Sequence, residues 1–345
     1  MLPLTCLAIG DCHFKTNSTL ATSRMSEAIL SVIEQRRPDF IVMLGDTLDR
    51  HETVNSIVLS QAIKFLHDLS SLAPTYLIIG NHDRPNNSDF LSDDHPFTAL
   101  RYWDNLTVVD KAVISEIQGK KFIFVPYVPP GRFHEALGTL TEDYHNATAI
   151  FAHQEFRGAK MGAIESTEGD IWDPTDPYTI SGHVHDYDEL QINLLYTGTP
   201  MQHAFGDKED KTISFFTFQG QSRYHERIDL HLPKKRMLHL TCNQLLQLNP
   251  ETFDVNTEVK IVAKGTSAEI KTLMKMQIIK DLEAKKVKIS YKEITEVTPL
   301  TSFLTAPGKG YYEKLSMAVA NDPEILQLLH TMFGPLKIKI AGLGN

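Results

Sequence analysis

The chain has 345 residues, a hydrophobic content of 42% and a formal net charge of −9. This length predicts about two domains, and the composition is ordinary for a globular protein. The negative net charge argues against a generally basic nucleic-acid-binding surface. Binding of a polyanion would therefore depend on bound cations and on local basic patches.

The cysteines and the N-terminus indicate an intracellular protein without a membrane segment. Cys6, Cys12 and Cys242 have no paired spacing, which is typical of a reducing compartment. Pro3 and the lack of a basic segment before the first apolar run argue against a signal peptide. No apolar run approaches the ~20 residues of a membrane helix. We therefore expect the cytoplasm or nucleoid, or the nucleus of a eukaryotic or viral host cell.

Five short apolar runs each end directly before side chains that bind metals well. Each run has the length and the β-branched or aromatic content of a buried strand. The runs span 4–10, 40–45, 75–80, 148–152 and 178–182, and they are followed by Asp11 and His13, by Asp46, by Asn81 and His82, by His153, and by His183 and His185. Since such side chains project from the carboxyl ends of neighbouring strands, we expect them to meet in one crevice.

Two amphipathic stretches lie between these strands. Residues 23–35 and 55–69 place apolar side chains at helical spacing, so strand, helix and strand alternate as in a layered α/β sheet. The stretch 55–69 also carries apolar residues outside one stripe. These could contact a second copy in a homodimer or lie beneath a loop of the same chain, and the sequence leaves both open.

The pattern changes after His185. Strands at 194–198, 212–218 and 222–232 are predicted to continue in antiparallel fashion and close the first domain, 1–232. A basic joint at 233–236 marks the boundary. A strand at 258–263, a helix at 267–285 with Ser267 as N-cap, and a strand at 287–291 then predict a small α/β capping domain, 233–297. Residues 298–345 are predicted to be a linker and a helical tail, with helices within 311–333.

The first ligand candidates suggest two neighbouring metal ions. Asp11 and His13 lie one residue apart on an extended segment, so both face the same way and can hold one ion. Gly45 allows a tight turn after its strand, and Asp46 then stands where one carboxylate can bridge two metals. In this pattern Cys12 should point away from the ligands and into the core.

The later candidates supply nitrogen and amide ligands. Asn81 offers an amide oxygen to a hard cation. His183 and His185 repeat the one-residue spacing of the first pair and suit adjacent metals. His153 follows a strand, although a lone histidine is more often a structural residue. The absence of cysteine from the set argues for a hydrolytic centre of two divalent cations, for which Mn²⁺ fits best and Mg²⁺ stays open.

The tetrapeptide 80–83 is the most specific motif. His82 follows Asn81 directly, points elsewhere, and is free to act as an acid or to stabilise charge. We expect Asp83 to orient His82. We expect Asp49 and His51 either to contact the metal ligands without binding a metal themselves or to lie on the surface. The remaining histidines have no partner at a telling spacing, and we assign them no role: His67, His95, His134, His145, His203, His225, His231, His239 and His330.

In order and spacing, these motifs resemble the calcineurin-like metallophosphoesterases, and within them the SbcD-type double-strand-break repair nucleases, including phage and viral relatives. The tetrapeptide Thr197-Gly198-Thr199-Pro200 resembles the signature that follows the last histidine pair in those nucleases. The resemblance implies the layered metallophosphoesterase sandwich, with a capping domain. It further implies that Asp11, His13 and His185 hold one metal, that Asn81, His153 and His183 hold the other, and that Asp46 bridges them.

The same resemblance implies a Mn²⁺-dependent DNA exonuclease and endonuclease with a two-metal mechanism. Its catalytic residues would be His82 and Asp83, and its partner an SbcC-type ATPase with a coiled coil. Two alternatives stay open: a phosphoprotein phosphatase or cyclic-nucleotide phosphodiesterase of the same fold, and a non-catalytic scaffold that binds DNA ends.

Overall fold

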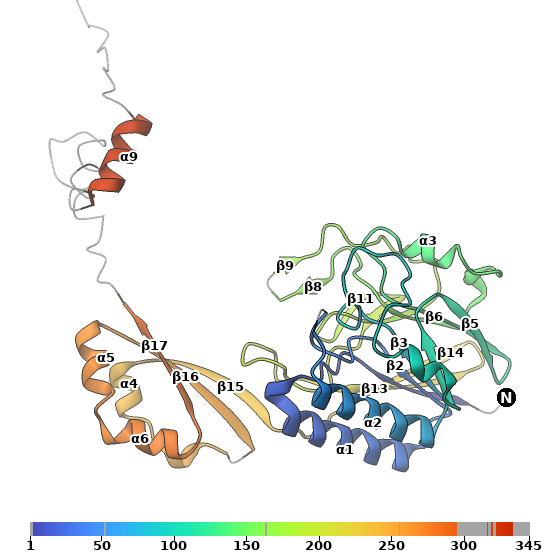
Figure 1. Cartoon of the computed structure of the whole chain (residues 1–345), viewed down its shortest axis with the longest axis horizontal. Coiled ribbons are helices and arrows are strands. Elements are labelled where there is room, and N and C mark those ends of the chain that lie inside the picture. Colours follow the sequence, from blue (N-terminus) through green and yellow to red (C-terminus); the bar gives the residue numbers. More distant parts are fainter. Residues whose placement is uncertain are drawn as a thin grey trace, which may run out of the picture. The chain divides into compact units, whose positions relative to one another are not determined.

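The computed structural model describes residues 3–51, 53–162, 164–254, 256–294, 316, 319 and 322–333. The predicted strands and helices between 4 and 232 form two large sheets with helices on their outer faces (Figure 1). The fold is therefore the mixed α/β arrangement expected from the sequence.

The first sheet carries the first three ligand-bearing strands. Its order is β14 (Ser222–Ile228), β13 (Ile213–Gln219), β1 (Leu4–Ile9), β2 (Phe40–Met43), β3 (Thr75–Ile78) and β4 (Leu106–Val109). Strands β1 to β4 are parallel, β13 pairs antiparallel with β1, and β14 pairs antiparallel with β13. The predicted antiparallel continuation is thus confirmed for β13 and β14.

The second sheet carries the other two ligand-bearing strands, β7 (Ala149–His153) and β10 (Thr179–Gly182). Its order is β11 (Asp188–Gln191), β12 (Leu194–Tyr196), β10, β7, β6 (Lys120–Val125) and β5 (Val113–Ile117). The expectation of neighbouring strands was therefore only partly right, because the five runs are divided between two sheets. Periodicity identifies a strand but carries no information on which sheet it joins.

The two sheets pack face to face through aromatic side chains. The ring of Phe40 on β2 lies 5.2 Å from that of Phe122 on β6 and 6.0 Å from that of Phe151 on β7. Alternate residues of β1 point to opposite faces, so Cys6 enters this layer while Leu7 points to the helices. Burial of each such large side chain contributes about 1.5–3 kcal/mol.

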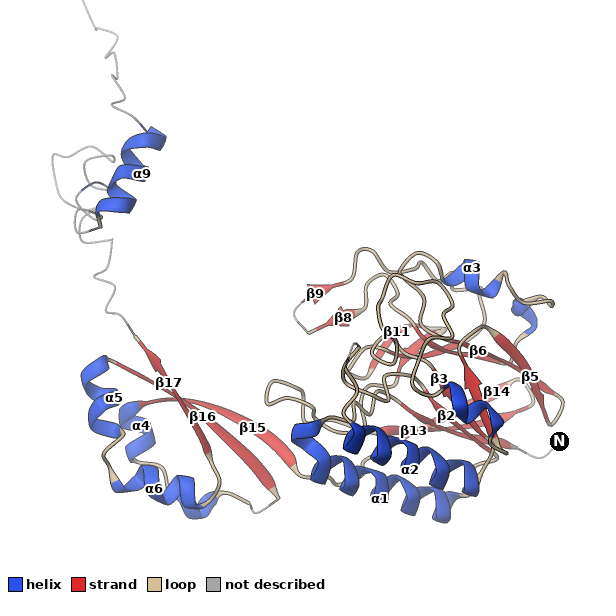
Figure 2. Cartoon of the chain, viewed as in Figure 1, coloured by secondary structure: helices blue, strands red, loops and turns tan. Residues whose placement is uncertain are grey.

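Helices α1 (Thr19–Arg36) and α2 (Ser56–Leu72) lie side by side on the outer face of the first sheet (Figure 2). The side chain of Asn55 begins α2 by accepting hydrogen bonds from the backbone N–H groups of Ile57 and Val58. The outer face of the second sheet is covered by α3 (Phe133–Leu137) and by Trp172. The smaller elements are η1 (Thr16–Ser18), η2 (Thr98–Tyr102), η3 (Tyr144–Asn146), β8 (Lys160–Met161) and β9 (Ile164–Glu165).

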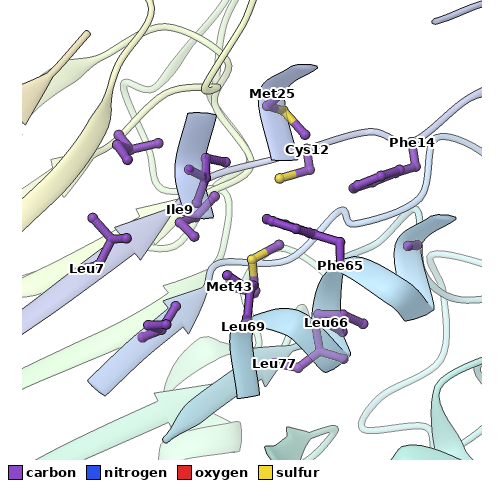
Figure 3. Packing of buried hydrophobic residues seen from close by; sticks show 14 of the residues in the cluster. Leu7, Ile9, Cys12, Phe14, Met25, Met43, Phe65, Leu66, Leu69 and Leu77 are labelled. Carbon is purple, nitrogen blue, oxygen red and sulfur yellow. The ribbon is translucent and has the colours of Figure 1, made fainter. Parts of the chain in front are cut away.

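Cys12 lies in the core beneath α1 and α2, as predicted. It is fully buried and shares a hydrophobic cluster with Phe14, Met25 and Phe65 (Figure 3). Burial raises the pKa of its thiol well above the ordinary value, so Cys12 is a packed thiol rather than a reactive one.

Gly10, directly after β1, lies where two backbone segments nearly touch. A Cβ atom there would lie 2.0 Å from the carbonyl oxygen of Gly198 and 2.9 Å from Oγ1 of Thr197. We therefore expect Gly10→Ala to lower the free energy of unfolding by about 1–3 kcal/mol in urea denaturation. Gly206→Ala is the control, since a Cβ at Gly206 meets nothing within 4 Å. Equal losses in the two variants would contradict this account.

Beyond residue 233 a three-stranded sheet has the order β15 (Lys234–Thr241), β16 (Thr257–Gly265) and β17 (Lys288–Glu293). Helices α4 (Cys242–Leu246), α5 (Ser267–Leu273) and α6 (Gln277–Ala284) accompany it, and η4 spans Pro250–Thr252. The predicted single helix 267–285 was wrong. Tight hydrogen bonds from the backbone N–H groups of Lys275 and Met276 to residues three earlier interrupt it.

The N-cap of α5 also differs from the prediction. Thr266, not Ser267, caps the helix in a reciprocal capping box with Glu269. Met274 is 56% exposed because it lies at the break between α5 and α6.

The described chain divides into two compact units. One comprises 1–238, 249–261 and 281–289, and the other 239–248, 262–280 and 290 onward. Within the predicted tail, α9 (Pro323–Phe333) is described, whereas most of 298–322 and all of 334–345 lie outside the described residues. None of the described helices is both long and apolar enough to span a membrane.

Candidate metal centre

Two groups of predicted ligands come together at the carboxyl ends of strands from both sheets. Asp11, His13 and His185 form the first group, and Asp46, His153 and His183 form the second. Within each group, one possible ligand atom of every residue lies within 4.8 Å of the others. We call these groups the first site and the second site.

The first site centres on two imidazoles. Nε2 of His13 lies 3.0 Å from Nε2 of His185. Two nitrogen lone pairs at this distance repel each other unless a proton or a cation lies between them. The carboxylate of Asp11 is fully buried and accepts a hydrogen bond of 2.9 Å from the backbone N–H of His183. These nitrogen and oxygen atoms fit a divalent cation.

The second site gathers an amide and two imidazoles. Oδ1 of Asn81 lies 3.0 Å from Nε2 of His153 and 3.0 Å from Nδ1 of His183. Nδ1 of His153 lies 2.6 Å from the carbonyl oxygen of Leu44. Because a carbonyl can only accept, Nδ1 carries the proton and the lone pair of Nε2 faces the site. Oδ1 of Asn81 and Nε2 of His153 therefore lie side by side, where one cation could contact both.

Asp46 lies between the two sites. One carboxylate oxygen, Oδ1, lies 3.4 Å from Nε2 of His153, and the other, Oδ2, lies 3.7 Å from Nε2 of His13. Oδ1 also accepts a hydrogen bond of 2.8 Å from the backbone N–H of His82. A carboxylate with one oxygen toward each site suits a bridge between two cations.

Three predicted ligands adopt left-handed backbone conformations that non-glycine residues rarely adopt. The φ angles are 43° at His13, 47° at Asp46 and 82° at His183. The prediction assumed an extended segment, in which alternate side chains such as those of Asp11 and His13 face the same way. This reason is wrong, because the backbone leaves the extended region at His13. Such conformations cost on the order of 1–3 kcal/mol each and are held by the surrounding structure.

Contrary to the prediction, Asp83 does not orient His82, whose Nε2 lies 4.0 Å from Oδ2 of Asp46. Nδ1 of His82 lies 2.9 Å from the backbone carbonyl oxygen of Asp49, and its ring stacks on that of His51 at 4.4 Å. The carboxylate of Asp83 instead accepts backbone hydrogen bonds from Thr47, Leu48 and Gly80. Asp83 therefore fixes the two loops that carry Asp46 and Asn81. A sequence motif cannot separate a carboxylate that binds a side chain from one that binds the backbone.

Burial and neighbouring charges set the protonation of the site. Burial lowers the pKa of His13 to about 3, which leaves a neutral imidazole ready to bind a metal. Burial opposes protonation of His153 too, but the adjacent charge of Asp46 outweighs it and raises the pKa to about 9. Without a cation, Nε2 of His153 therefore carries a proton, which a metal would displace to reach the lone pair. Burial, aided by the charge of Asp46, raises the pKa of Asp83 to about 7.

Three side chains near the site were missed or undervalued by sequence reasoning. Nε2 of His203 lies 3.0 Å from the carbonyl oxygen of Asp11, and Nζ of Lys211 donates a hydrogen bond of 2.6 Å to the carbonyl oxygen of His185. Oε2 of Glu155 lies 3.9 Å from Nε2 of His183. His203 and Lys211 follow no strand end. Their only sequence signal is that they come shortly after the motif at 197–200.

The comparisons with known proteins agree with this geometry. The model of the calcineurin-like phosphoesterase family matches residues 4–187, a segment that contains all seven predicted ligands. The chain belongs to the calcineurin-like phosphoesterases. Members of this family are hydrolases of phosphoesters that use divalent metals, and the two sites of this calcineurin-like phosphoesterase supply candidate ligands for them.

Two viral proteins, both phosphoesterases by name, resemble this calcineurin-like phosphoesterase over most of its length. The 078R protein of invertebrate iridescent virus 3 is 39% identical over 290 residues, covering 83% of this chain and 83% of that protein. The 244L protein of invertebrate iridescent virus 6 is 39% identical over 282 residues, covering 79% of this chain and 98% of that protein. Among solved structures, GAP50, the anchor in the inner membrane complex of Plasmodium, aligns with a TM-score of 0.42 and 13% identity, covering 67% of this chain and 85% of that one.

Proposed function

We propose that this phosphoesterase is a DNA nuclease of the SbcD type, which hydrolyses phosphodiesters with two divalent cations, Mn²⁺ first among them. The observation that carries the proposal is the pair of sites with Asp46 between them and His82 at their edge. The motif at 80–83 and the signature at 197–200 favour this branch of the family.

Each residue of the centre has a distinct task in this proposal. Asp11, His13 and His185 would hold one cation, Asn81, His153 and His183 the other, and Asp46 both. Bound cations would neutralise phosphoryl oxygens and lower the pKa of the attacking water. The Nδ1–H of His82 donates to Asp49, so a further proton on Nε2 makes the ring cationic. In that form His82 can stabilise the phosphoryl charge and protonate the leaving 3′-oxygen.

Pockets beside His82 favour an extended substrate over a compact one. A pocket of about 410 Å³ is lined by Arg50, His51, His82 and Arg84. Two more, of about 480 and 490 Å³, share Arg50 with it and are also lined by Asp49 and Thr53. A polynucleotide strand could place successive nucleotides in these pockets, which meet at Arg50. A cyclic nucleotide or a single phosphorylated side chain would fill only one pocket.

A comparison of three substrates tests the nuclease proposal. Linear DNA, a cyclic nucleotide and a phosphopeptide are incubated with the protein and Mn²⁺, and again with a chelator. We expect chelator-sensitive cleavage of DNA and little turnover of the other two. Preferential hydrolysis of the phosphopeptide or the cyclic nucleotide would support the alternative phosphatase or phosphodiesterase function. DNA binding without turnover of any substrate would support a scaffold.

We also propose that the C-terminal tail binds an SbcC-type coiled-coil ATPase. Helix α9 has exposed apolar side chains at Ile325 and Leu328, 48% and 58% exposed among the described residues. The first part of the predicted helical segment, 311–321, lies mostly outside the described residues. A protein that ends near Thr305 should hydrolyse a small phosphodiester at the original rate but lose association with the ATPase. Undiminished association would refute the docking role, and unfolding would indicate that the tail packs on its own chain.

A further inference from the structure

His203 lies against the first site without belonging to its ligands. Its ring centroid lies 5.0 Å from that of His13, at a steep interplanar angle of 77°, and 5.8 Å from that of His185. The ring of His203 therefore packs against His13 and His185, the two imidazoles whose Nε2 atoms lie 3.0 Å apart. His203 thus packs directly against two of the candidate ligands of the first site.

The hydrogen bond of His203 fixes what its ring can do. Nε2 lies 3.0 Å from the backbone carbonyl oxygen of Asp11. A carbonyl only accepts, so Nε2 carries a proton and donates it. A protonated nitrogen has no lone pair for a cation, so Nε2 of His203 acts on the backbone of Asp11 rather than on a metal.

The carbonyl of Asp11 belongs to the segment that carries two first-site ligands. The N–H groups of His13 and Phe14 on this segment donate to the carbonyls of Asp46 and Thr47, at 3.0 and 2.8 Å. His203 donates to the same segment, at the carbonyl oxygen of Asp11. Together these bonds stabilise a backbone that His13, with φ of 43°, would rarely adopt alone.

His203 is itself anchored independently of the site. Its backbone N–H donates a hydrogen bond of 2.7 Å to Oδ2 of Asp207. Nζ of Lys235 donates to the carbonyl oxygens of Gln202 and His203, at 3.0 and 3.3 Å. The donor therefore stands in place before any cation arrives, which is what a preorganised site requires.

We propose that His203 is a positioning residue of the first site, which fixes the Asp11–His13 backbone and thereby raises the affinity of that site for its cation. The role rests on the binuclear centre of the proposed function, but not on DNA as the substrate. It assigns a specific effect to a histidine that no sequence motif marks.

A matched pair of substitutions tests the role through metal binding alone. His203→Gln keeps an N–H donor of similar reach, whereas His203→Leu has similar volume and no donor. Each protein is titrated with Mn²⁺ in a calorimeter, and thermal unfolding in chelator checks that it is folded. His225→Leu is the control, because His225 is a partly buried histidine on β14 whose Nε2 bonds Oγ of Ser214.

We expect the unaltered protein and His225→Leu to bind two Mn²⁺. His203→Leu should bind one of the two about 10- to 100-fold more weakly, the range seen when groups that orient metal ligands are removed. His203→Gln should restore most of that affinity. If the leucine variant does not fold, His203→Phe, which keeps the ring and lacks the donor, gives the same comparison.

Undiminished affinity in the leucine or phenylalanine variant would overturn the role. So would a glutamine variant as weak as the leucine variant, because that result would assign the effect to ring packing instead of the hydrogen bond. Binding of fewer than two Mn²⁺ by the unaltered protein is a separate outcome. It would overturn the binuclear centre itself, and the role of His203 with it.

Discussion

Replacing Asp46 by alanine is expected to remove both metals and to lower phosphodiester hydrolysis by about 10³-fold or more. Its two carboxylate oxygens face different sites, 3.4 Å from Nε2 of His153 and 3.7 Å from Nε2 of His13. A bridging ligand contributes to both cations, and loss of several kcal/mol of metal-dependent stabilisation corresponds to such a factor.

The measurement pairs metal stoichiometry with turnover of a small phosphodiester. His13→Ala provides the comparison, because it removes a ligand from the first site alone and should leave the second cation bound. Asp68→Ala is the control for loss of a carboxylate, since Asp68 pairs with Lys64 on the surface of α2 and should not matter. An Asp46 variant that retains two tightly bound metals would contradict the bridging assignment.

The strands and the ligand candidates were accessible from the sequence because both follow local rules. A buried strand such as β2 is a short apolar run, and the residue after it is fixed in space by the strand itself. Asp46 and His153 could therefore be placed at strand ends without knowing how the strands pair. Cys12 could be assigned to the core for the same reason.

The errors concern relations between distant segments. The division of the strands between two sheets depends on packing such as that of Phe40 on Phe122, which periodicity does not encode. The positive φ angle of His13 is maintained by bonds to the Asp46 loop, some 33 residues away in the numbering. Asp83 appeared to be a partner of His82 because they are adjacent, but its carboxylate satisfies buried backbone N–H groups.

His203 illustrates a further limit. Its contact with Asp11 spans 192 positions of the chain and is made by a side chain to a backbone carbonyl. No spacing rule predicts such a bond, because every residue has the same backbone carbonyl and the sequence does not mark which one accepts. Side chains that support a site through the backbone are therefore the class most readily missed from one sequence.

His82→Ala should leave both metals bound and reduce DNA turnover by about 10²- to 10⁴-fold, the usual contribution of general acid–base groups. Its Nε2 lies 4.0 Å from Oδ2 of Asp46, and its side chain is 32% exposed, so it can reach a substrate without being a ligand of either site. Metal stoichiometry and single-turnover cleavage of DNA measure the two effects. Loss of a metal in this variant would make His82 a ligand and end its assignment as an acid.

The leaving group separates the two roles open to His82. A 3′-hydroxyl leaves poorly as an alkoxide and benefits from a proton, whereas a nitrophenolate leaves readily without one. If His82 protonates the leaving oxygen, its removal should slow DNA cleavage far more than hydrolysis of bis(p-nitrophenyl) phosphate. If it mainly neutralises phosphoryl charge, both substrates should slow alike, because both pass through a similarly charged phosphoryl group. The ratio of the two losses, measured with both metals bound, therefore decides how His82 contributes.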